Sequence, residues 1–479
     1  MARVLFAWEL GKGFGHLAPY LDLVKGLLKK GHQVVFAARD VGNTERIFGN
    51  DGVTILQAPI MMHNIGNPYR IQYNLSHLIH NIGFAEIRSL FGLAKAWRHI
   101  YHYVRPDLVL FDHSPTALLA ARAYPWKRIV SGSGFLIPPS AVPLPMMRYW
   151  QEYDQEKLAR EEGGLLANMN RVLEILKVPP LKSVAALYDA DAHFHLGFKE
   201  LDHYPQRPPV EYLGMFSPPN HGVAPDWPAG GLKKVFAYLH PYKQIPALLK
   251  ILGSANFSTI VYAPEVPDAI KKKFQNERMV FSAKPLDVAK VSADCDFAIT
   301  NGTFGTTAAF LLYGKPVLCI PTNLERVMVT RRVIGLGGGL GVQPTKLDKI
   351  KPALRALASS EKYAEAARAF GAGYKDLNLA WQTEKMLATV ERLLASAPKQ
   401  KPAAAAGAEA LAPRDPGEAA LARQLGAQAD TAVSEAPAAP DEAMGGGGEG
   451  RSALPEARSP DAAPAHRGSH RRSRKGRHK

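Results

Sequence analysis

The hydrophobic pattern of residues 1–38 predicts a strand, a glycine-containing loop, a helix and a second strand. Residues 4–7 form a short apolar run, residues 17–30 carry apolar side chains at helical spacing, and residues 32–38 form a second apolar run. This order is typical of a parallel sheet. Apolar runs at 53–56, 108–112 and 128–130 extend the predicted sheet, and residues 146–177 have the pattern of an amphipathic helix.

A second alternating set begins after a segment rich in proline and glycine, residues 217–231. Short apolar runs that predict strands lie at 235–239, 259–262, 279–281, 297–299 and 316–320. Helical patterns fill the gaps, including one that we expect from about Ala308, and residues 350–395 are predicted to be helical. The pattern therefore predicts two parallel α/β halves joined by a linker.

Composition adds a third region. Residues 396–479 contain no Phe, Trp, Tyr or Ile, and Ala, Pro and Gly dominate them. Such a segment cannot bury enough apolar surface to offset the entropy of ordering, so we expect it to be disordered. The expected organisation is an N-terminal Rossmann-like domain, a linker, a C-terminal Rossmann-like domain, a final helix and a disordered tail, at residues 1–216, 217–231, 232–375, 376–395 and 396–479.

The net charge of +16 has two sources. Residues 1–395 carry 46 basic and 33 acidic residues, and residues 467–479 carry seven basic residues and no acidic one. The basic body is compatible with a diphosphate ligand and with peripheral contact at an anionic membrane surface. The basic end lacks aromatic residues for base stacking, so we expect no specific nucleic-acid partner.

Several classes of protein are excluded. No apolar run approaches the roughly 20 residues of a membrane-spanning helix, and residues 1–8 do not resemble a signal peptide. The two cysteines, Cys295 and Cys319, form neither a disulfide framework nor a cysteine-rich metal site. We therefore expect a cytoplasmic protein with no metal, either free or peripheral at the inner face of the membrane.

His16 and Asp112 are the candidate catalytic pair. His16 follows the glycine loop that contains Gly13 and Gly15, and Asp112 ends the run 108–112. Imidazole can take a proton from a hydroxyl near neutral pH, and a carboxylate at a neighbouring strand end can orient the ring. Alternatives are a simple tight turn at the glycines, helix capping by Asp112, and His113 as a rival base.

The second half contains a candidate phosphate cradle between a predicted strand and the following helix. Glycine, threonine and asparagine side chains gather there, at Asn301, Gly302, Thr303, Gly305 and Thr306. Free N–H groups and the helix dipole favour an anion at such a position. Further on, Glu325 can accept hydrogen bonds from sugar hydroxyls and Arg326 can donate to phosphate or sugar oxygens. Residues 335–341 (GLGGGLG) predict another flexible loop.

Taken together, these motifs resemble the UDP-glycosyltransferase family. Residues 13–19 (GFGHLAP) resemble the family's GxGHxxP opening, and residues 106–112 (PDLVLFD) resemble its PDLVxxD strand. Residues 294–321 resemble its donor block, with Glu325 and Arg326 at the position of its acidic residue and glutamine. The likeness extends over about residues 1–395 in the family's order.

The resemblance implies a GT-B fold, which is an α/β architecture of two Rossmann-like domains that face each other across a cleft. It implies transfer of a hexose, with inversion and without a metal, from a UDP- or dTDP-sugar to a lipophilic small-molecule or lipid acceptor. The nucleotide sugar is then a co-substrate, and no cofactor is expected. By position, His16 corresponds to the family's base and Asp112 to its partner.

The sequence also departs from the family pattern. Asn301 replaces the family's donor histidine and Ala309 its helix glutamate, while residues 239–241 replace a glycine–serine turn. These changes leave open an alternative, a GT-B protein that binds nucleotide sugars without turnover. A third hypothesis, a dinucleotide-dependent oxidoreductase, depends on the glycine loop and Asp40, but His16 occupies the position of the third glycine.

Overall fold

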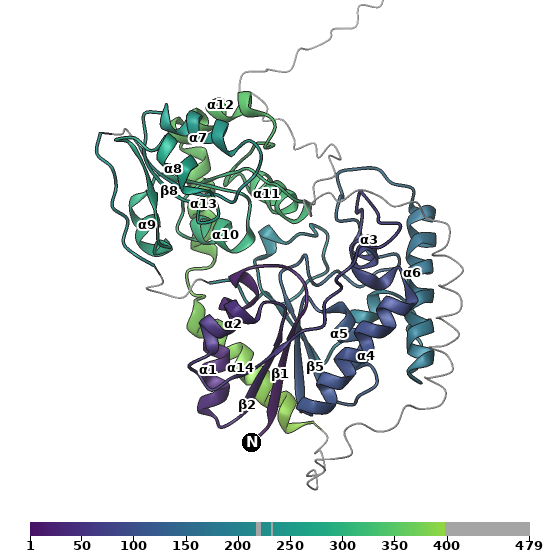
Figure 1. Ribbon diagram of the computed structural model, residues 1–479. Helices are drawn as coiled ribbons and strands as arrows, with labels where there is room; N and C mark the ends of the chain where they lie inside the picture. Colours follow the sequence, from purple (N-terminus) through teal and green to yellow (C-terminus); the bar gives the residue numbers. More distant parts are fainter. Residues whose placement is uncertain (217–221, 231–232, 398–479) are drawn as a thin grey trace, which may run out of the picture.

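The computed structural model describes residues 1–216, 222–230 and 233–397 (Figure 1). The predicted disordered tail from 398 onward, including the basic end, and residues 217–221 and 231 of the predicted linker lie outside the described residues. The described chain forms two six-stranded sheets in which neighbouring strands pair in parallel. The predicted α/β class with two Rossmann-like halves is confirmed.

The first sheet has the strand order β3-β2-β1-β4-β5-β6. Its strands are β1 (Arg3–Trp8), β2 (Gln33–Ala38), β3 (Thr54–Gln57), β4 (Leu108–Asp112), β5 (Lys127–Gly132) and β6 (Ala192–His195). One face packs against α4 (Ile87–Val104), α5 (Pro115–Ala121) and α6 (Gln155–Ile175), and the short α3 (Leu75–Ile79) joins this layer. The other face packs against α1 (Leu21–Lys29) and α2 (Val41–Phe48). Both faces are covered, which explains the continuous apolar runs of the strands.

The second sheet has the strand order β12-β11-β10-β7-β8-β9. Its strands are β7 (Lys234–Tyr238), β8 (Ser258–Tyr262), β9 (Met279–Ser282), β10 (Phe297–Thr300), β11 (Val317–Cys319) and β12 (Gly339–Gly341). Its helices are α7 (Ile245–Gly253), α8 (Asp268–Phe274), α9 (Val288–Asp294), α10 (Phe304–Leu312), α11 (Leu324–Leu336), α12 (Ile350–Ser359) and α13 (Lys362–Gly373). In both sheets the strand order reverses beside the first strand, which is where ligands bind in doubly wound folds.

The last helix, α14 (Leu379–Ala395), returns to the first domain and lies beside α1 (Figure 1). Its residues Met386, Val390 and Leu393 are buried in the core beneath the first sheet. The Gln382 side chain donates to the carbonyl of Gly214 at 2.9 Å. The sequence predicted this helix but not its docking site, because an amphipathic pattern does not identify the surface that it covers.

Four local predictions were wrong. The helix expected over residues 17–30 begins only at Leu21, after two 3₁₀ turns, and α6 begins at Gln155 rather than at 146. The donor-side helix begins at Phe304 instead of near Ala308, because Gly and Thr follow Phe304 in its first turn and carry no apolar periodicity. Residues 339–341 of the predicted glycine loop form the edge strand β12.

Candidate active site

His16 and Asp112 lie side by side at the carboxyl edge of the first sheet. Neighbouring strands β1 and β4 place Trp8 opposite Asp112, and His16 follows β1 in a 3₁₀ turn. The imidazole Nδ1 lies 2.6 Å from Oδ1 of Asp112. A proton on Nδ1 satisfies this contact, and the assigned tautomer then leaves the lone pair of Nε2 free to accept a proton.

The Asp112 carboxylate is oriented by a hydrogen-bond chain on the side away from His16. The Tyr20 hydroxyl donates to Oδ2 of Asp112 at 2.7 Å and lies 2.7 Å from Oγ of Ser131. Since Tyr20 has one proton to give, Ser131 must donate to Tyr20. The predicted alternative that Asp112 caps the following helix is wrong, because both of its oxygens point to His16 and Tyr20.

Two residues of the first strand and its loop fix the position of the His16 ring. The Trp8 indole stacks on the imidazole with centroids 5.1 Å apart. Gly11 has φ +86°, and a Cβ added there would lie 2.2 Å from Nε2. Glycine is therefore required at position 11 both for its backbone angle and for the close approach to the base.

The His16 ring is partly shielded from water, with 15% of its side chain exposed. Burial lowers its pKa, but the charge and hydrogen bond of Asp112 outweigh burial, so the pKa lies above its ordinary value. Glu325 of the second domain also raises the pKa of His16 through its charge. The pKa of Glu325 is itself raised by burial, and the charge of His16 opposes that rise. The charges of His16 and Glu325 thus influence each other across the domain boundary.

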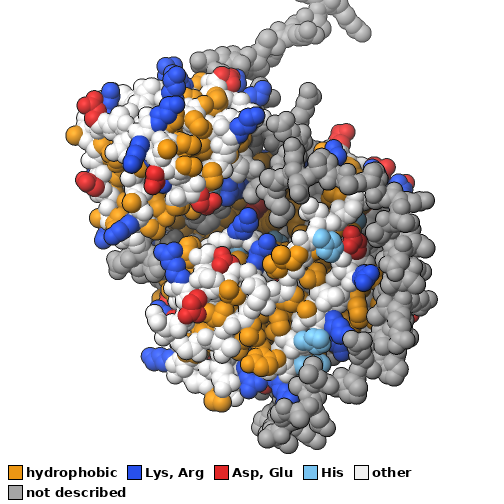
Figure 2. Space-filling view, in the orientation of Figure 1, with side chains coloured by type: hydrophobic (Ala, Val, Ile, Leu, Met, Phe, Trp, Pro, Cys, Tyr) orange, Lys and Arg blue, Asp and Glu red, His pale blue; other side chains and the backbone are white. Residues whose placement is uncertain are grey.

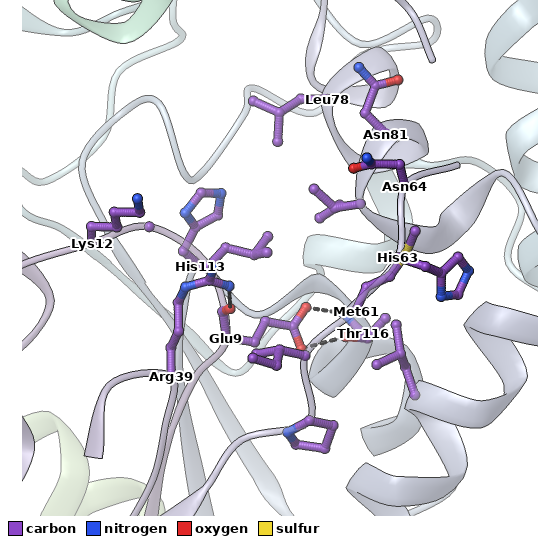
Figure 3. Close-up of a pocket in the computed structure, with 16 residues that line it drawn as sticks. Glu9, Lys12, Arg39, Met61, His63, Asn64, Leu78, Asn81, His113 and Thr116 are labelled. Carbon is purple, nitrogen blue, oxygen red and sulfur yellow. Dashed lines mark hydrogen bonds between the residues drawn. The ribbon is translucent and has the colours of Figure 1, made fainter. Parts of the chain in front are cut away.

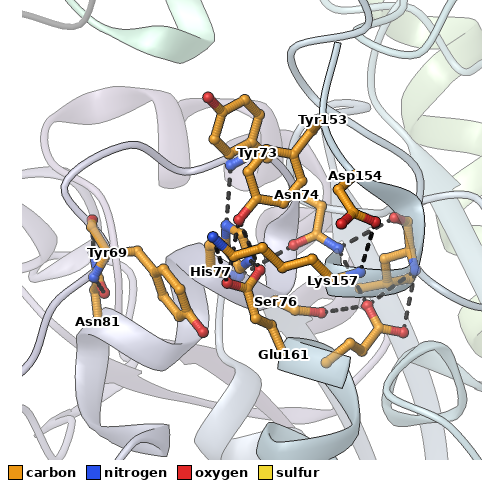
Figure 4. A network of polar contacts seen from close by, with 12 residues as sticks. Tyr69, Tyr73, Asn74, Ser76, His77, Asn81, Tyr153, Asp154, Lys157 and Glu161 are labelled. Atoms are coloured by element: carbon orange, nitrogen blue, oxygen red, sulfur yellow. Dashed lines mark hydrogen bonds and ion pairs between the residues drawn. The ribbon is translucent and has the colours of Figure 1, made fainter. Parts of the chain in front are cut away.

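A cavity of about 360 Å³ lies beside this pair within the first domain (Figure 3). Gly11 and His113 form part of its wall, so the cavity adjoins the backbone that covers His16. A hydrogen-bonded network braces another part of the wall around α3 (Figure 4). In it His77 pairs with Glu161 at 2.9 Å and stacks on Tyr69, while the Asn81 side chain both donates to and accepts from the backbone of Tyr69.

Sequence reasoning missed Glu9, and it offered His113 only as a rival base. The Glu9 carboxylate accepts hydrogen bonds from the backbone and hydroxyl of Thr116 and from the indole N–H of Trp97, so it caps the start of α5. His113 has φ +45° and its Nε2 has no partner among the described residues. Burial and the charges of His16 and Arg39 lower the pKa of His113 to about 3, which makes it a poor base. The available signal for Glu9 was its position as an acidic residue directly after β1.

In the second domain, the glycine and threonine motif forms the N-terminal turn of α10. Thr303 occupies the N-cap position without a side-chain cap, and its Oγ1 is buried with no partner among the described residues. Gly302 has φ +74°, and a Cβ there would lie 2.9 Å from the carbonyl of Arg326. The uncapped first turn, which includes Gly305 and Thr306, can bind an anion through its N–H groups.

Asn301 is placed differently from the other predicted donor residues. It is fully buried, its Oδ1 accepts from the backbone N–H of His240 at 2.6 Å, and its Nδ2 donates to the carbonyl of Ile320 at 3.0 Å. The side chain therefore ties together the loops that follow β7, β10 and β11. The geometry gives Asn301 a bracing role, and only its second amide hydrogen is left for a ligand.

Glu325 and Arg326 begin α11, which Asn323 caps by accepting from the backbone N–H of Arg326. The Arg326 guanidinium donates to Oγ1 of Thr322 at 2.7 Å. The guanidinium of this pair is thus turned toward the loop that precedes the helix.

Aromatic and apolar contacts join the two domains next to this site. His203 of the first domain stacks on Phe304 with centroids 5.5 Å apart, and Arg331 lies 4.2 Å above the ring of Trp150. Met147 and Met328 share one buried cluster. Figure 2 shows the surface hollowed where the domains meet. These contacts place α10 and α11 against the first domain.

Two negative findings apply to the described residues. No group of three or more His, Cys, Asp or Glu side chains there is arranged to hold a metal ion. Within the same ranges, no helix has the length and apolar character needed to cross a membrane.

Proteins of known structure share this architecture. No family model and no curated protein matches the chain. Among solved structures, the kitacinnamycin glycosyltransferase has a TM-score of 0.60 at 16% identity, covering 82% of this chain and 98% of the other. The calicheamicin glycosyltransferase has a TM-score of 0.61 at 17% identity, with the same coverage. A glycosyltransferase solved with dTDP has a TM-score of 0.58 at 17% identity, covering 82% of this chain and all of the other.

The chain therefore has the GT-B fold. It shares this fold, over 82% of its length, with the kitacinnamycin and calicheamicin glycosyltransferases. The identities are low, so the comparisons establish the architecture, and the chemistry must be argued from the site.

Proposed function

We propose that the protein is an inverting glycosyltransferase that moves a hexose from a nucleotide-diphosphate sugar to a hydroxyl of a lipophilic acceptor. The observation that carries this proposal is the His16–Asp112 pair, which adjoins a cavity in one domain, while the charge of Glu325 in the other domain helps to raise the pKa of His16. Support for a UDP- or dTDP-sugar comes from the fold, since one protein that shares it was solved with dTDP and another with thymidine diphosphate.

In the proposed reaction the acceptor lies in the cavity of the first domain with its hydroxyl at Nε2 of His16. The ring takes the hydroxyl proton as the oxygen attacks the anomeric carbon, and Asp112 stabilises the imidazolium that forms. The bond between that carbon and the diphosphate oxygen breaks on the opposite side, which inverts the anomeric centre. The leaving diphosphate gains negative charge, and the N–H groups at the start of α10 are placed to stabilise it without a metal.

Glu325 has a separate role in this proposal. Its carboxylate faces the base across the space where the sugar must lie, so it can accept hydrogen bonds from sugar hydroxyls and orient the anomeric carbon. Gly15 lies directly before His16, and a Cβ there would have nothing within 4 Å, so this position leaves room for the donor. The roles of Thr303, Gly305 and Thr306 are to hold the diphosphate, and Arg326 is a further donor to it.

The test is transfer and hydrolysis of UDP- and dTDP-sugars over an acceptor panel, with wild type compared against His16→Ala. The proposal expects a product in which the anomeric configuration is inverted, and a large loss of rate in the variant. Equal rates for the two proteins would show that His16 is not the base.

The placement of Asn301 favours one second candidate, a protein that binds nucleotide sugars without turnover. The family's donor histidine is replaced here by a side chain whose two polar atoms are already bonded to backbone groups. Calorimetry with UDP-, dTDP- and GDP-sugars separates the two candidates, because binding without transfer to any acceptor supports the second. The structure argues against the oxidoreductase hypothesis, which needed the Asp40 carboxylate for a dinucleotide. That carboxylate caps α2 by accepting from the backbone N–H of Asn43 at 2.9 Å.

A further inference from the structure

The cavity beside His16 has a positively charged wall. Lys12 and Arg39 line it on the side where His113 also lies (Figure 3). The Arg39 guanidinium donates to the backbone carbonyl of Glu9 at 3.0 Å, and no carboxylate pairs with it among the described residues. Arginine carries five N–H donors, so most of those on Arg39 are available to a ligand. Two unpaired cations on one wall favour a ligand with a negative charge.

Glu9 is the one acidic residue that lines the cavity, and it does not cancel this charge. Its carboxylate is committed to Thr116 and Trp97 at the start of α5. Burial raises the pKa of Glu9 to about 7, against the opposing effect of these hydrogen bonds. Its contact with Arg39 runs through its backbone carbonyl, so the guanidinium charge remains unpaired.

His113 adds a hydrogen-bonding group to the same wall without adding charge. Its ring is partly buried and stays neutral at physiological pH, and its buried Nε2 has no partner among the described residues. A buried nitrogen without a partner costs free energy, which a ligand oxygen or hydroxyl at this position would recover. The ring lies 6.1 Å from that of His16, measured between centroids.

Apolar side chains make up much of the remaining lining. They belong to Ile60, Met61, Leu78, Ile82 and Leu93, and the polar side chains of His63, Asn64 and Asn81 lie beside them (Figure 3). At about 360 Å³ the cavity is large enough for a small organic molecule with an aromatic or similarly sized apolar body. The cavity thus combines two cations on one side with a mixture of apolar and polar side chains on the other.

We propose that the acceptor is an amphipathic acid: an apolar body that carries the reacting hydroxyl and, on its polar side, a carboxylate or another anionic group held by Arg39 and Lys12, with His113 hydrogen-bonding beside it. This inference rests on the proposed function, because it assigns the cavity to the acceptor. It deepens that function by naming the chemical class of the substrate.

The experiment compares acids with their neutral esters. We would measure the binding of para-coumarate and para-hydroxybenzoate, each beside its methyl ester, to the full-length protein by calorimetry without donor. The acid and ester of each pair have the same hydroxyl and ring, so the difference reports the charge. We expect the better-fitting acid to bind about ten- to a hundredfold more tightly than its ester, the range that a charge-assisted hydrogen bond supplies.

Variants locate the effect. Arg39→Gln should reduce the preference for the acid to near unity, and Lys12→Gln should reduce it in part, while affinity for the esters stays the same. The matched control is Arg88→Gln: Arg88 is exposed on α4, which also supplies Leu93 to the cavity, but it is not part of the cavity wall. A preference that survives Arg39→Gln, or that falls equally in Arg88→Gln, would overturn the proposal, and so would equal binding of acid and ester.

Failure of this inference is distinguishable from failure of the proposed function. Transfer of sugar to esters as readily as to acids, abolished by His16→Ala, would refute the acidic acceptor and leave the transferase intact. Binding of acids that depends on Arg39, with no transfer from any nucleotide sugar, would support the assigned ligand class and refute the transferase.

Discussion

Nδ1 of His16 lies 2.6 Å from Oδ1 of Asp112 although 96 positions separate the two residues in the sequence. The pairing follows from topology, because β1 and β4 are adjacent parallel strands and their carboxyl ends meet at one edge. Tyr20 and Ser131 hold the carboxylate from behind, so the orientation of the base depends on residues from four segments of the first domain.

Asp112→Asn should slow transfer and shift its pH dependence. His16 acts as a base only when unprotonated, so the rate falls as the pH drops through its pKa, which Asp112 raises. Removing the charge should move the midpoint of the acid limb of kcat/KM to lower pH and reduce kcat on the order of 10³- to 10⁴-fold. Profiles of wild type and variant over pH 5–9 check this. Asp22→Asn, in the first turn of α1, is the control, and an unmoved midpoint would contradict the assignment.

Two glycines of the same loop offer a matched pair. Gly11 and Gly13 have φ of +86° and +82°, so a side chain strains either backbone to a similar extent. At Gly11 an added Cβ would also lie 2.2 Å from Nε2 of His16, whereas at Gly13 nothing lies within 4 Å. Gly11→Ala should therefore abolish transfer, while Gly13→Ala costs a similar ~1–2 kcal/mol of stability and retains activity. Parallel assays of melting temperature and rate check the pair, and equal loss of activity would mean that strain alone is responsible.

Variants of Asn301 should show whether its side chain stabilises the loops around it or contacts the donor. Asn301→Ala leaves the N–H of His240 and the carbonyl of Ile320 without their partner, at about 1–3 kcal/mol each. Asn301→Asp keeps an acceptor for His240 but turns an oxygen toward that carbonyl, so it should also destabilise. Urea unfolding measures the loss. An Asn301→Ala protein of wild-type stability with weakened dTDP binding would instead assign the side chain to the donor.

The topology and the proximity of His16 and Asp112 could be predicted from the sequence for a physical reason. Buried parallel strands must be continuously apolar, so their runs are visible, and polar residues directly after them must lie at the ligand-binding edge. His16, Asp112 and the turn that begins α10 were found in this way. The start of α10 was misplaced because Phe304, Gly305 and Thr306 carry no helical periodicity.

What could not be predicted depends on where side chains point. Asn301 has the composition of a ligand-binding residue, but its atoms are used by two loops that come together only in the fold. Lys12 and Arg39 come from two separate loops, and only the fold brings them to one wall of the cavity. The lowered pKa of His113 could not be predicted either, because it depends on burial of the ring. Short edge strands such as β6 and β12 lack enough residues to show a pattern.

His203 should make the domain interface sensitive to acid. The ring stacks on Phe304 of the second domain, is fully buried, and neither of its nitrogens has a partner among the described residues. Burial is the main cause that lowers its pKa from 6.5 to about 4. Because the folded-state pKa is depressed, stability present above pH 6.5 is lost as the pH falls toward 4, by about 3 kcal/mol in total at about 1.4 kcal/mol per unit.

His203→Leu removes the titrating ring and keeps an apolar side chain of similar size. The free energy of unfolding of the variant should therefore change less than that of wild type between pH 7 and pH 4, and the difference should grow steadily through that window. Urea unfolding at several pH values measures it, with His99→Gln on the exposed face of α4 as a control for loss of an imidazole. If wild type and His203→Leu lose stability in parallel, His203 does not titrate within the interface, and the acid sensitivity must lie with other groups.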